Sequence, residues 1–160
     1  MKILCVSLLL CFAHQYASAK TVQGIVTHVS DGDTLWIEVD PKIKPIKVRL
    51  QGIDAPEICQ VWGTQSRDAL KARLLRKSVS LNTRAKDDYN RALGQVALQG
   101  EDVGAWLVKN GHAWSYHHRR NPGPYASEQA TAQRALLGLW ARSGAQEPRQ
   151  FRKVHGSCKN

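Results

Sequence analysis

Residues 29–39 read VSDGDTLWIEV, in which two aspartates around one glycine lead into an alternating apolar and polar segment. Apolar side chains at positions 35, 37 and 39 face one side and Trp36 and Glu38 face the other, which is typical of a half-buried β-strand. An Asp-Gly pair before such a strand favours a hairpin turn, because glycine supplies the positive φ values that a tight turn needs. The same aspartates could instead form half of a metal site, and this stretch alone leaves both interpretations open.

The neighbouring segments predict an α+β fold that is mainly β. Strand-like alternation or β-branched composition marks four further segments: 22–29, 46–53, 79–84 and 92–98. Helical spacing of apolar residues marks three: 64–76, 101–110 with Gly111 as a C-terminal cap, and 125–141. Prolines and glycine make the stretch HHRRNPGPY before the third helix a loop. Five short strands with three helices predict a small, partly open β-barrel capped by helices.

The first 19 residues have the composition of a secretory signal peptide. Lys2 precedes an uncharged apolar run from Ile3 to Phe12, and Ala17-Ser18-Ala19 ends the segment. A retained membrane anchor is the weaker alternative, since roughly ten apolar residues fall short of the ~20 that span a bilayer. The residues before Cys11 do not favour lipid attachment there. We therefore expect a secreted or periplasmic protein with no stable membrane association after cleavage.

Cleavage removes 19 of 160 residues and leaves 141, which suit one domain over 20–144 and a basic C-terminal tail over 145–160. The formal net charge of the full chain is +10, and Lys2 is the only charged residue removed, so the mature chain carries +9. A small domain this basic usually binds a polyanion, such as nucleic acid, an anionic membrane or an acidic polysaccharide.

Two of the four cysteines, Cys59 and Cys158, remain after cleavage. In an oxidising compartment an isolated pair is most simply a disulfide, here one that ties the tail to the middle of the chain. A free thiol and an intermolecular bridge are the alternatives. The absence of a CxxC or Cys-His cluster in the sequence argues against a zinc site.

Charged side chains are expected to meet at one end of the predicted sheet. If the first three strands form an antiparallel meander, the residue before the second strand and the end of the third lie at the same end. Asp33, Arg49, Asp54 and Glu57 would then converge. A cluster of unpaired carboxylates is electrostatically unfavourable and calls for a cation, and carboxylate and carbonyl oxygens on loops suit Ca²⁺.

Three motifs stand in register along this strand-turn-strand background: DGDT at 31–34, RLQGIDAPE at 49–57 and DDYNRA at 87–92. GHAW at 111–114 and GLW at 138–140 extend the pattern over nearly all of the mature chain. In these motifs the chain resembles the thermonuclease family, the staphylococcal-nuclease-like domains. The resemblance implies a five-stranded oligonucleotide/oligosaccharide-binding (OB-fold) barrel and a calcium-dependent hydrolase of DNA and RNA phosphodiesters. We expect the chain to be a monomer.

The resemblance also implies roles for individual residues. It makes Asp33 and Asp54 ligands of Ca²⁺, with the backbone carbonyl of Ala55 as a third ligand. Ala55 replaces the threonine of the family's best-known member, which removes a hydroxyl near the metal but leaves the carbonyl. Asn90 stands where glycine is common before the second arginine, and we expect the turn to survive because asparagine tolerates a left-handed conformation.

The same resemblance makes Arg49 and Arg91 contacts of the scissile phosphate and Glu57 the residue that contacts the attacking water. The chemistry of these side chains agrees independently, since in-line attack builds negative charge that guanidiniums and a divalent cation neutralise. Arginine suits the task better than lysine because its planar fork binds two phosphate oxygens and stays protonated. Glu57 must be ionised to orient or accept a water proton.

Most of these residues also have a simpler structural interpretation. Arg49 could be an ordinary outward strand arginine and Arg91 a solvated hairpin charge, while Asp31 more simply orients the turn. His117 and His118 favour a basic loop over a metal site, because adjacent histidines do not converge on one ion. The tail is solvated and flexible by default, although a bridge through Cys158 would hold it near Cys59, beside the predicted site.

Two other classes of protein share some of these features. A non-catalytic nucleic-acid-binding barrel would bind strands through a basic groove and aromatic platforms alone. A secreted polyanion-binding structural protein would explain the charge and the disulfide, but not the carboxylate-arginine set. The sequence leaves open the preference for DNA or RNA and for strandedness, because no tyrosine in WSYHHRR aligns securely with the family's base-covering residues.

Overall fold

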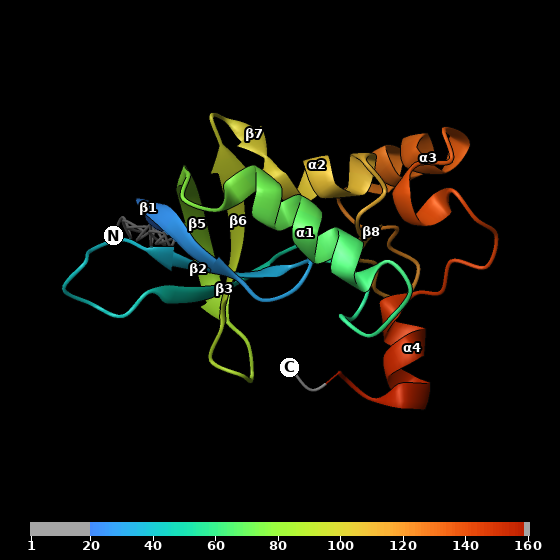
Figure 1. The fold of residues 1–160 in the computed structure, drawn as a ribbon, viewed down its shortest axis with the longest axis horizontal. Coiled ribbons are helices and arrows are strands. Elements are labelled where there is room, and N and C mark those ends of the chain that lie inside the picture. The colour runs from blue at the N-terminus through green and yellow to red at the C-terminus, as the bar shows by residue number, and fades with distance from the viewer. Residues whose placement is uncertain (1–19, 159–160) are drawn as a thin grey trace, which may run out of the picture.

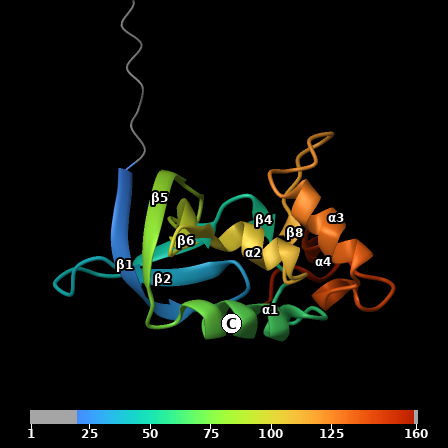
Figure 2. The same cartoon turned by 90° about the horizontal axis from the view of Figure 1, so that it is seen from above.

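A computed structural model of the chain describes residues 20–158. The expected signal segment, with Lys2 and Cys11, lies outside the described residues. Among the helices that the structure describes, none is long and apolar enough to cross a membrane. In two perpendicular views most of the strands gather at one end of the molecule, and the helices α3 (Ala126–Arg134) and α4 (Pro148–His155) lie at the other (Figures 1 and 2).

One sheet has the strand order β3-β2-β1-β5-β6-β7. Its strands are β1 (Lys20–Val29), β2 (Thr34–Glu38), β3 (Ile46–Leu50), β5 (Ser78–Lys86), β6 (Ala92–Leu98) and β7 (Glu101–Asp102). β3 also pairs with β6 in parallel, with Arg49 opposite Leu93. That pairing closes β1, β2, β3, β6 and β5 into a barrel, which confirms the predicted five-stranded OB-fold; the barrel is closed rather than partly open.

Within residues 20–158, four α-helices and one 3-10 helix accompany the barrel: α1 (Gly63–Leu74), α2 (Val103–Lys109), α3 (Ala126–Arg134), η1 (Gly138–Trp140) and α4 (Pro148–His155). A separate two-stranded ladder joins β4 (Ile53–Asp54) to β8 (Trp114–Ser115). In Figure 1, α1 crosses in front of the molecule from the strands toward α4. The β4–β8 ladder fixes the segment after β3 against the helical half of the molecule.

The barrel interior follows the alternation expected from the sequence. Leu35 and Ile37 of β2 are fully buried, as are Val48 of β3 and the helix residues Leu70 and Leu107, all at 0% exposure. Their removal from water is the main favourable contribution to this fold. Because the inward positions are apolar, the polar positions of β3 point outward, toward the site described below.

The DGDT turn differs from the simple hairpin interpretation. Asp31 accepts a hydrogen bond from the Asp33 N–H at 3.0 Å, and Ser30 N–H bonds the Thr34 carbonyl at 2.9 Å. Gly32 does not have a positive φ. It is buried, and a Cβ placed there would lie 2.1 Å from the Ser66 Oγ of α1. Glycine is therefore needed for close approach of the turn to α1.

Two helical predictions need correction. The expected helix over 125–141 ends at Arg134, because Leu136 and Gly138 adopt positive φ values of 52° and 56° and the Leu139 N–H turns back to bond Gly111. The expected helix over 101–110 begins two residues later, at Val103, and Asp102 caps it by accepting from Ala105 N–H. Residues 148–155 form α4, whereas the sequence favoured a flexible tail.

Candidate active site

The β2–β3 pairing brings the first two motifs together. Thr34 lies opposite Arg49 in the register, and the Leu50 N–H donates to the Asp33 carbonyl at 2.8 Å. Arg49 then spans two buried carboxylates. Its Nη1 donates to Asp33 Oδ1 at 2.7 Å and its Nη2 to Asp54 Oδ1 at 3.1 Å. Both aspartates are less than 5% exposed, so Arg49 is an internal bridge, not an ordinary surface arginine.

Backbone and hydroxyl donors complete the surroundings of Asp33. Its Oδ2 accepts from the Ala55 N–H at 3.2 Å, and its Oδ1 also accepts from the Thr34 hydroxyl at 3.1 Å. Asp33 thereby connects the turn before β2 to the segment after β4. The structure places three predicted metal-site residues, Asp33, Asp54 and Ala55, in one connected cluster.

Arg91 reaches the same region from the β5–β6 turn. Asp87 accepts from its backbone N–H and its Nε, at 2.9 and 2.7 Å, and holds the guanidinium in place. Burial alone would raise the pKa of Asp87, but these hydrogen bonds from Arg91 hold that pKa below its usual value. Asn90 adopts φ 58°, the left-handed conformation expected from the sequence. The Arg91 Nη1 lies 3.4 Å from the Thr34 hydroxyl, one residue from Asp33.

Glu57 is held by the loop between β4 and α1. Its N–H donates to Gln60 Oε1 at 3.1 Å, and its carbonyl accepts from the Gln60 N–H at 2.8 Å. A Cβ added at Gly63 would lie 1.9 Å from the Glu57 carbonyl oxygen, so the first turn of α1 packs directly on this loop. The half-buried carboxylate of Glu57 therefore has a fixed place at the edge of the cluster.

Arg152 is a member of the cluster that sequence reasoning missed. It projects from α4 and makes paired contacts with Asp54, Nη1 to Oδ1 at 3.1 Å and Nη2 to Oδ2 at 2.9 Å. The same Nη1 lies 3.0 Å from Glu57 Oε1. The available signal was the cysteine pair, since Cys59 and Cys158 form the expected disulfide and bring the tail beside Glu57.

The cluster carries more negative than positive charge. Asp31, Asp33, Asp54 and Glu57 face only two directly bonded guanidiniums, those of Arg49 and Arg152. Burial, together with the neighbouring Asp33, raises the pKa of Asp31 to about 7. Burial also raises the pKa of Asp54 despite its contacts with Arg152, and the field of Asp33 raises the pKa of Arg49. A cation at this place would relieve the excess.

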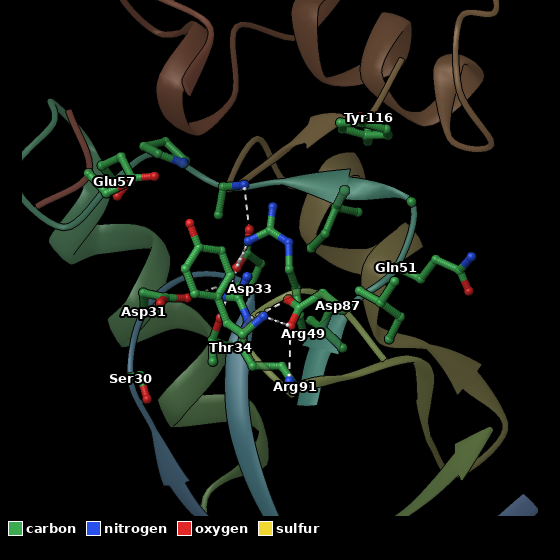
Figure 3. Close-up of a pocket in the computed structure, with 18 of the residues that line it drawn as sticks. Ser30, Asp31, Asp33, Thr34, Arg49, Gln51, Glu57, Asp87, Arg91 and Tyr116 are labelled. Carbon is green, nitrogen blue, oxygen red and sulfur yellow. Dashed lines mark hydrogen bonds and ion pairs between the residues drawn. The ribbon is translucent and has the colours of Figure 1, made fainter. Parts of the chain in front are cut away.

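The cluster opens into a cleft with a volume of about 1160 Å³. Figure 3 shows Asp33, Thr34, Arg49, Asp87 and Arg91 gathered at its centre, with Glu57 and Tyr116 at its edges. Tyr116 and Tyr89 are 43% and 82% exposed, and the Arg91 guanidinium lies 5.4 Å from the Tyr89 ring centre. Aromatic faces beside guanidiniums suit a polyanion that carries planar groups.

The donor set fits a hard divalent cation. In the part of the chain that the structure describes, no three His, Cys, Asp or Glu side chains form a ready-made cage. Two buried carboxylates with a neighbouring carbonyl nevertheless provide oxygen ligands of the kind that Ca²⁺ takes together with water. Asp31 supports the DGDT turn by its hydrogen bond and lies at the edge of this set.

The adjacent histidines do not converge. His117 Nε2 lies 3.2 Å from Glu147 Oε1, whereas His118 forms an isolated backbone bridge with Asn121. This arrangement agrees with the basic-loop interpretation. Trp114 of β8 packs edge-on against Trp140, with ring centres 4.3 Å apart, which agrees with a packing role.

The fold and the site together define the class of this protein. It is a closed OB-fold barrel in which one arginine bridges two buried carboxylates. Residues 47–142 match the sequence model of the family described as staphylococcal nuclease homologues. An uncharacterized endonuclease of Haemophilus influenzae is 39% identical over 153 residues, covering 95% of this chain and 85% of that protein. The chain belongs to the staphylococcal nuclease homologue family.

Two further relatives cover most of the chain as well. A micrococcal nuclease of Shigella flexneri is 32% identical over 149 residues, which covers 86% of this chain and 84% of that protein. An uncharacterized endonuclease of Escherichia coli is 37% identical over 121 residues, covering 75% and 78%.

Proposed function

We propose that this protein is a calcium-dependent nuclease that hydrolyses phosphodiester bonds of DNA and RNA by attack of water. The observation that carries the proposal is the bridge from Arg49 to the buried carboxylates of Asp33 and Asp54. Arg49 and Asp33 themselves line an open cleft. Burial of charged groups is unfavourable unless they are paired, and a structural role alone does not call for such a set beside a cleft. The names of the relatives support the same activity.

Asp33, Asp54 and the carbonyl of Ala55 would hold Ca²⁺. When bound there, the ion would neutralise charge on a phosphate oxygen. Arg49 and Arg91 reach the cleft from two directions, held by Asp33 and Asp87 respectively. Their planar guanidiniums would bind the non-bridging oxygens of one phosphodiester and stabilise the charge that develops on them.

Glu57 would orient the attacking water. Its carboxylate lies at the edge of the cleft and accepts a hydrogen bond from Arg152 at 3.0 Å. An ionised carboxylate accepts a proton from water, and a positioned base typically contributes ~10²- to 10⁴-fold in rate. The proposal assigns Glu57 the orienting role and Arg49 and Arg91 the electrostatic one.

A non-catalytic nucleic-acid-binding barrel is the main competing function. Such a barrel needs a basic groove and aromatic platforms, and it gains nothing from carboxylates that repel phosphates. Three carboxylates of the cluster line the cleft, those of Asp31, Asp33 and Glu57, and they favour hydrolysis over simple binding.

The decisive test is degradation of linear and closed-circular DNA, and of RNA, by the mature chain in Ca²⁺ or in excess chelator. Glu57→Gln should fold and bind DNA normally but lose about 10²-fold or more in turnover. Glu128→Gln on α3 makes the same chemical change away from the cleft and should keep full turnover. Loss of the closed circle would demonstrate internal cutting. Unchanged turnover in Glu57→Gln would remove that residue from the mechanism, and DNA binding without cleavage would favour the binding barrel.

We further propose that the protein acts outside the cytoplasm as a monomer. The basic mature chain, the apolar N-terminal segment of the sequence and the Cys59–Cys158 disulfide support export to an oxidising compartment. Mass spectrometry of the exported protein should give an N-terminus at Lys20, and size-exclusion chromatography should give the mass of one chain. An intact Met1 on the exported protein would contradict signal cleavage.

A further inference from the structure

The feature that the proposed reaction leaves unexplained is Arg152 of α4. It contacts both the proposed metal ligand Asp54 and the proposed water-orienting residue Glu57. No other residue described in the C-terminal segment forms an ion pair with this cluster. An arginine placed there has to affect whatever else binds to Asp54.

Asp54 has little capacity left for a metal while Arg152 is bound. A carboxylate offers about four lone-pair directions. Asp54 uses three of them, one for Arg49 Nη2 and two for the Arg152 guanidinium. The positive charge of Arg152 also repels a divalent cation at the same carboxylate, and the repulsion is strong where water is largely excluded.

The two arginines differ in how they are held. Arg49 lies on β3, opposite Thr34, and its guanidinium is held by two carboxylates, Asp33 and Asp54, that are both less than 5% exposed. Arg152 extends from α4, whose own attachments do not involve its guanidinium. These are the disulfide, the bond from Gln60 Nε2 to the Gln146 carbonyl at 2.7 Å, and the contact of His117 with Glu147. The Arg152 side chain can therefore swing away while α4 stays attached.

We propose that Arg152 is a tethered competitor of the metal ion at Asp54, kept in place by α4 and the disulfide. Binding of the ion requires Arg152 to release the Asp54 oxygens, so the chain's affinity for the ion is set partly by this contact. The released guanidinium lies beside the cleft, where it becomes available to a substrate phosphate. The inference rests on the proposed function, because it assumes that Asp54 is a metal ligand.

The test is calorimetric titration of the mature chain with Ca²⁺ alone, in the absence of nucleic acid. Arg152→Gln should bind Ca²⁺ about tenfold or more tightly, since a charge-assisted pair of hydrogen bonds no longer competes. Lys153→Gln removes one positive charge from the same helix at an exposed position and should change the affinity less than about twofold. Arg152→Lys keeps the charge but loses the planar fork, so its affinity should fall between those of the wild type and Arg152→Gln.

Hydrogen–deuterium exchange provides a readout that does not depend on affinity. Saturating Ca²⁺ should raise exchange in α4 of the wild type, because the helix loses its contacts with Asp54 and Glu57. The same addition should leave exchange in α4 of Arg152→Gln unchanged. The rise in exchange on addition of Ca²⁺ should be larger in a variant in which Cys59 and Cys158 are both replaced by alanine, because this variant lacks the disulfide that tethers α4.

The outcomes separate this inference from the proposed function. Equal Ca²⁺ affinity in the wild type and Arg152→Gln, or a lower affinity in the variant, would overturn the competition and leave calcium-dependent hydrolysis intact. An equal gain in Arg152→Gln and Lys153→Gln would overturn it too, because net charge alone would then explain the gain. Failure of every variant to bind Ca²⁺, with cleavage persisting in chelator, would overturn the competition and the proposed calcium site together.

Discussion

Arg49 is the side chain on which the charge balance of the cleft depends most. Its two terminal nitrogens serve two different carboxylates, those of Asp33 and Asp54. A lysine has one point of charge and cannot bridge both. In Arg49→Lys one of the two buried carboxylates would lose its hydrogen-bond partner. A bound phosphate would lose the pair of hydrogen bonds that a planar guanidinium can donate.

We therefore predict that Arg49→Lys lowers kcat about 10²-fold or more at saturating Ca²⁺ and lowers the free energy of unfolding by about 1–3 kcal/mol. Turnover assays and urea unfolding measure the two effects. Arg134→Lys, on the exposed surface of α3, is the matched control and should change neither quantity. Wild-type turnover in Arg49→Lys would show that a single positive charge suffices.

Individual site residues were predictable where local sequence determines their place. Asp33, Arg49 and Asp54 lie at strand ends, and strand pairing fixes such positions once the meander is recognised. Arg152 was not predictable in this way, because its contacts join residues 98 positions apart in the sequence. Only the cysteine pair indicated that the tail returns to this place, and it gave no hint of which tail residue faces Asp54.

At the scale of elements, the turn between β5 and β6 acts as the support of Arg91. Asp87 accepts from the N–H groups of Tyr89 and Arg91 and from the Arg91 side chain. The turn is exposed and packs little apolar surface, so the Asp87 carboxylate is its main side-chain support, beside two backbone hydrogen bonds between Asp87 and residues 90 and 91. Its loss should affect the position of Arg91 more than the stability of the fold.

Asp87→Ala should lower kcat about tenfold while changing the free energy of unfolding by less than about 1 kcal/mol. Asp88→Ala removes the same charge from the next position, which accepts no such hydrogen bonds, and should keep nearly full activity. Steady-state kinetics with thermal unfolding distinguishes the two variants. Equal losses in both would mean that the charge of the turn matters, not the support of Arg91.

His112 connects α1 to α2 in a way that makes stability depend on pH. It stacks between Trp62 and Trp106, and its Nδ1 accepts from Trp62 Nε1 at 3.4 Å. Burial lowers the pKa of His112 below its usual value of about 6.5. The unfolded chain therefore takes up a proton before the folded chain does, so this contribution is present above pH 6.5 and is lost as pH falls below it.

Between pH 7 and pH 5 the wild type should lose more unfolding free energy than His112→Asn, which keeps an acceptor but does not titrate. Urea unfolding at a series of pH values measures the difference. His28→Asn replaces an exposed histidine of β1 and should follow the wild-type profile. A His112→Asn profile parallel to that of the wild type would mean that other groups cause the acid sensitivity.

The element boundaries show where local patterns stop being informative. The apolar spacing continues past Arg134, yet the helix ends there and Leu136 adopts a positive φ. The reason is that Gly138 packs against Gly111: a Cβ added at Gly138 would lie 2.2 Å from the Gly111 carbonyl oxygen. That constraint comes from a distant segment and has no local signature. The helix α4 has only eight residues, with Phe151 and Val154 as its large apolar side chains, so its segment is too short for the spacing of apolar residues to predict a helix firmly.

At the scale of the whole molecule, barrel closure and the disulfide hold the two halves of the site together. The β3–β6 pairing brings Arg49 and the turn that carries Arg91 to one side of the barrel. The disulfide fixes α4 over the same side, across a sequence separation of 99 residues. Composition and motif order predicted the barrel, but the fixed position of α4 follows only from the three-dimensional structure.

The disulfide should contribute measurably to stability as well as to the site. Closing a loop of this length removes much conformational freedom from the unfolded chain, and we expect the double replacement of Cys59 and Cys158 by alanine to cost about 2–4 kcal/mol of unfolding free energy. Urea denaturation measures the loss, and addition of a thiol reductant should reproduce it in the wild type but have no effect on the variant. Because the barrel core does not include the disulfide, circular dichroism of the variant should still show a folded barrel. A stability equal to that of the wild type would mean that α4 is held by its other contacts, those of Gln60 and His117, and that the tether acts only on the position of Arg152.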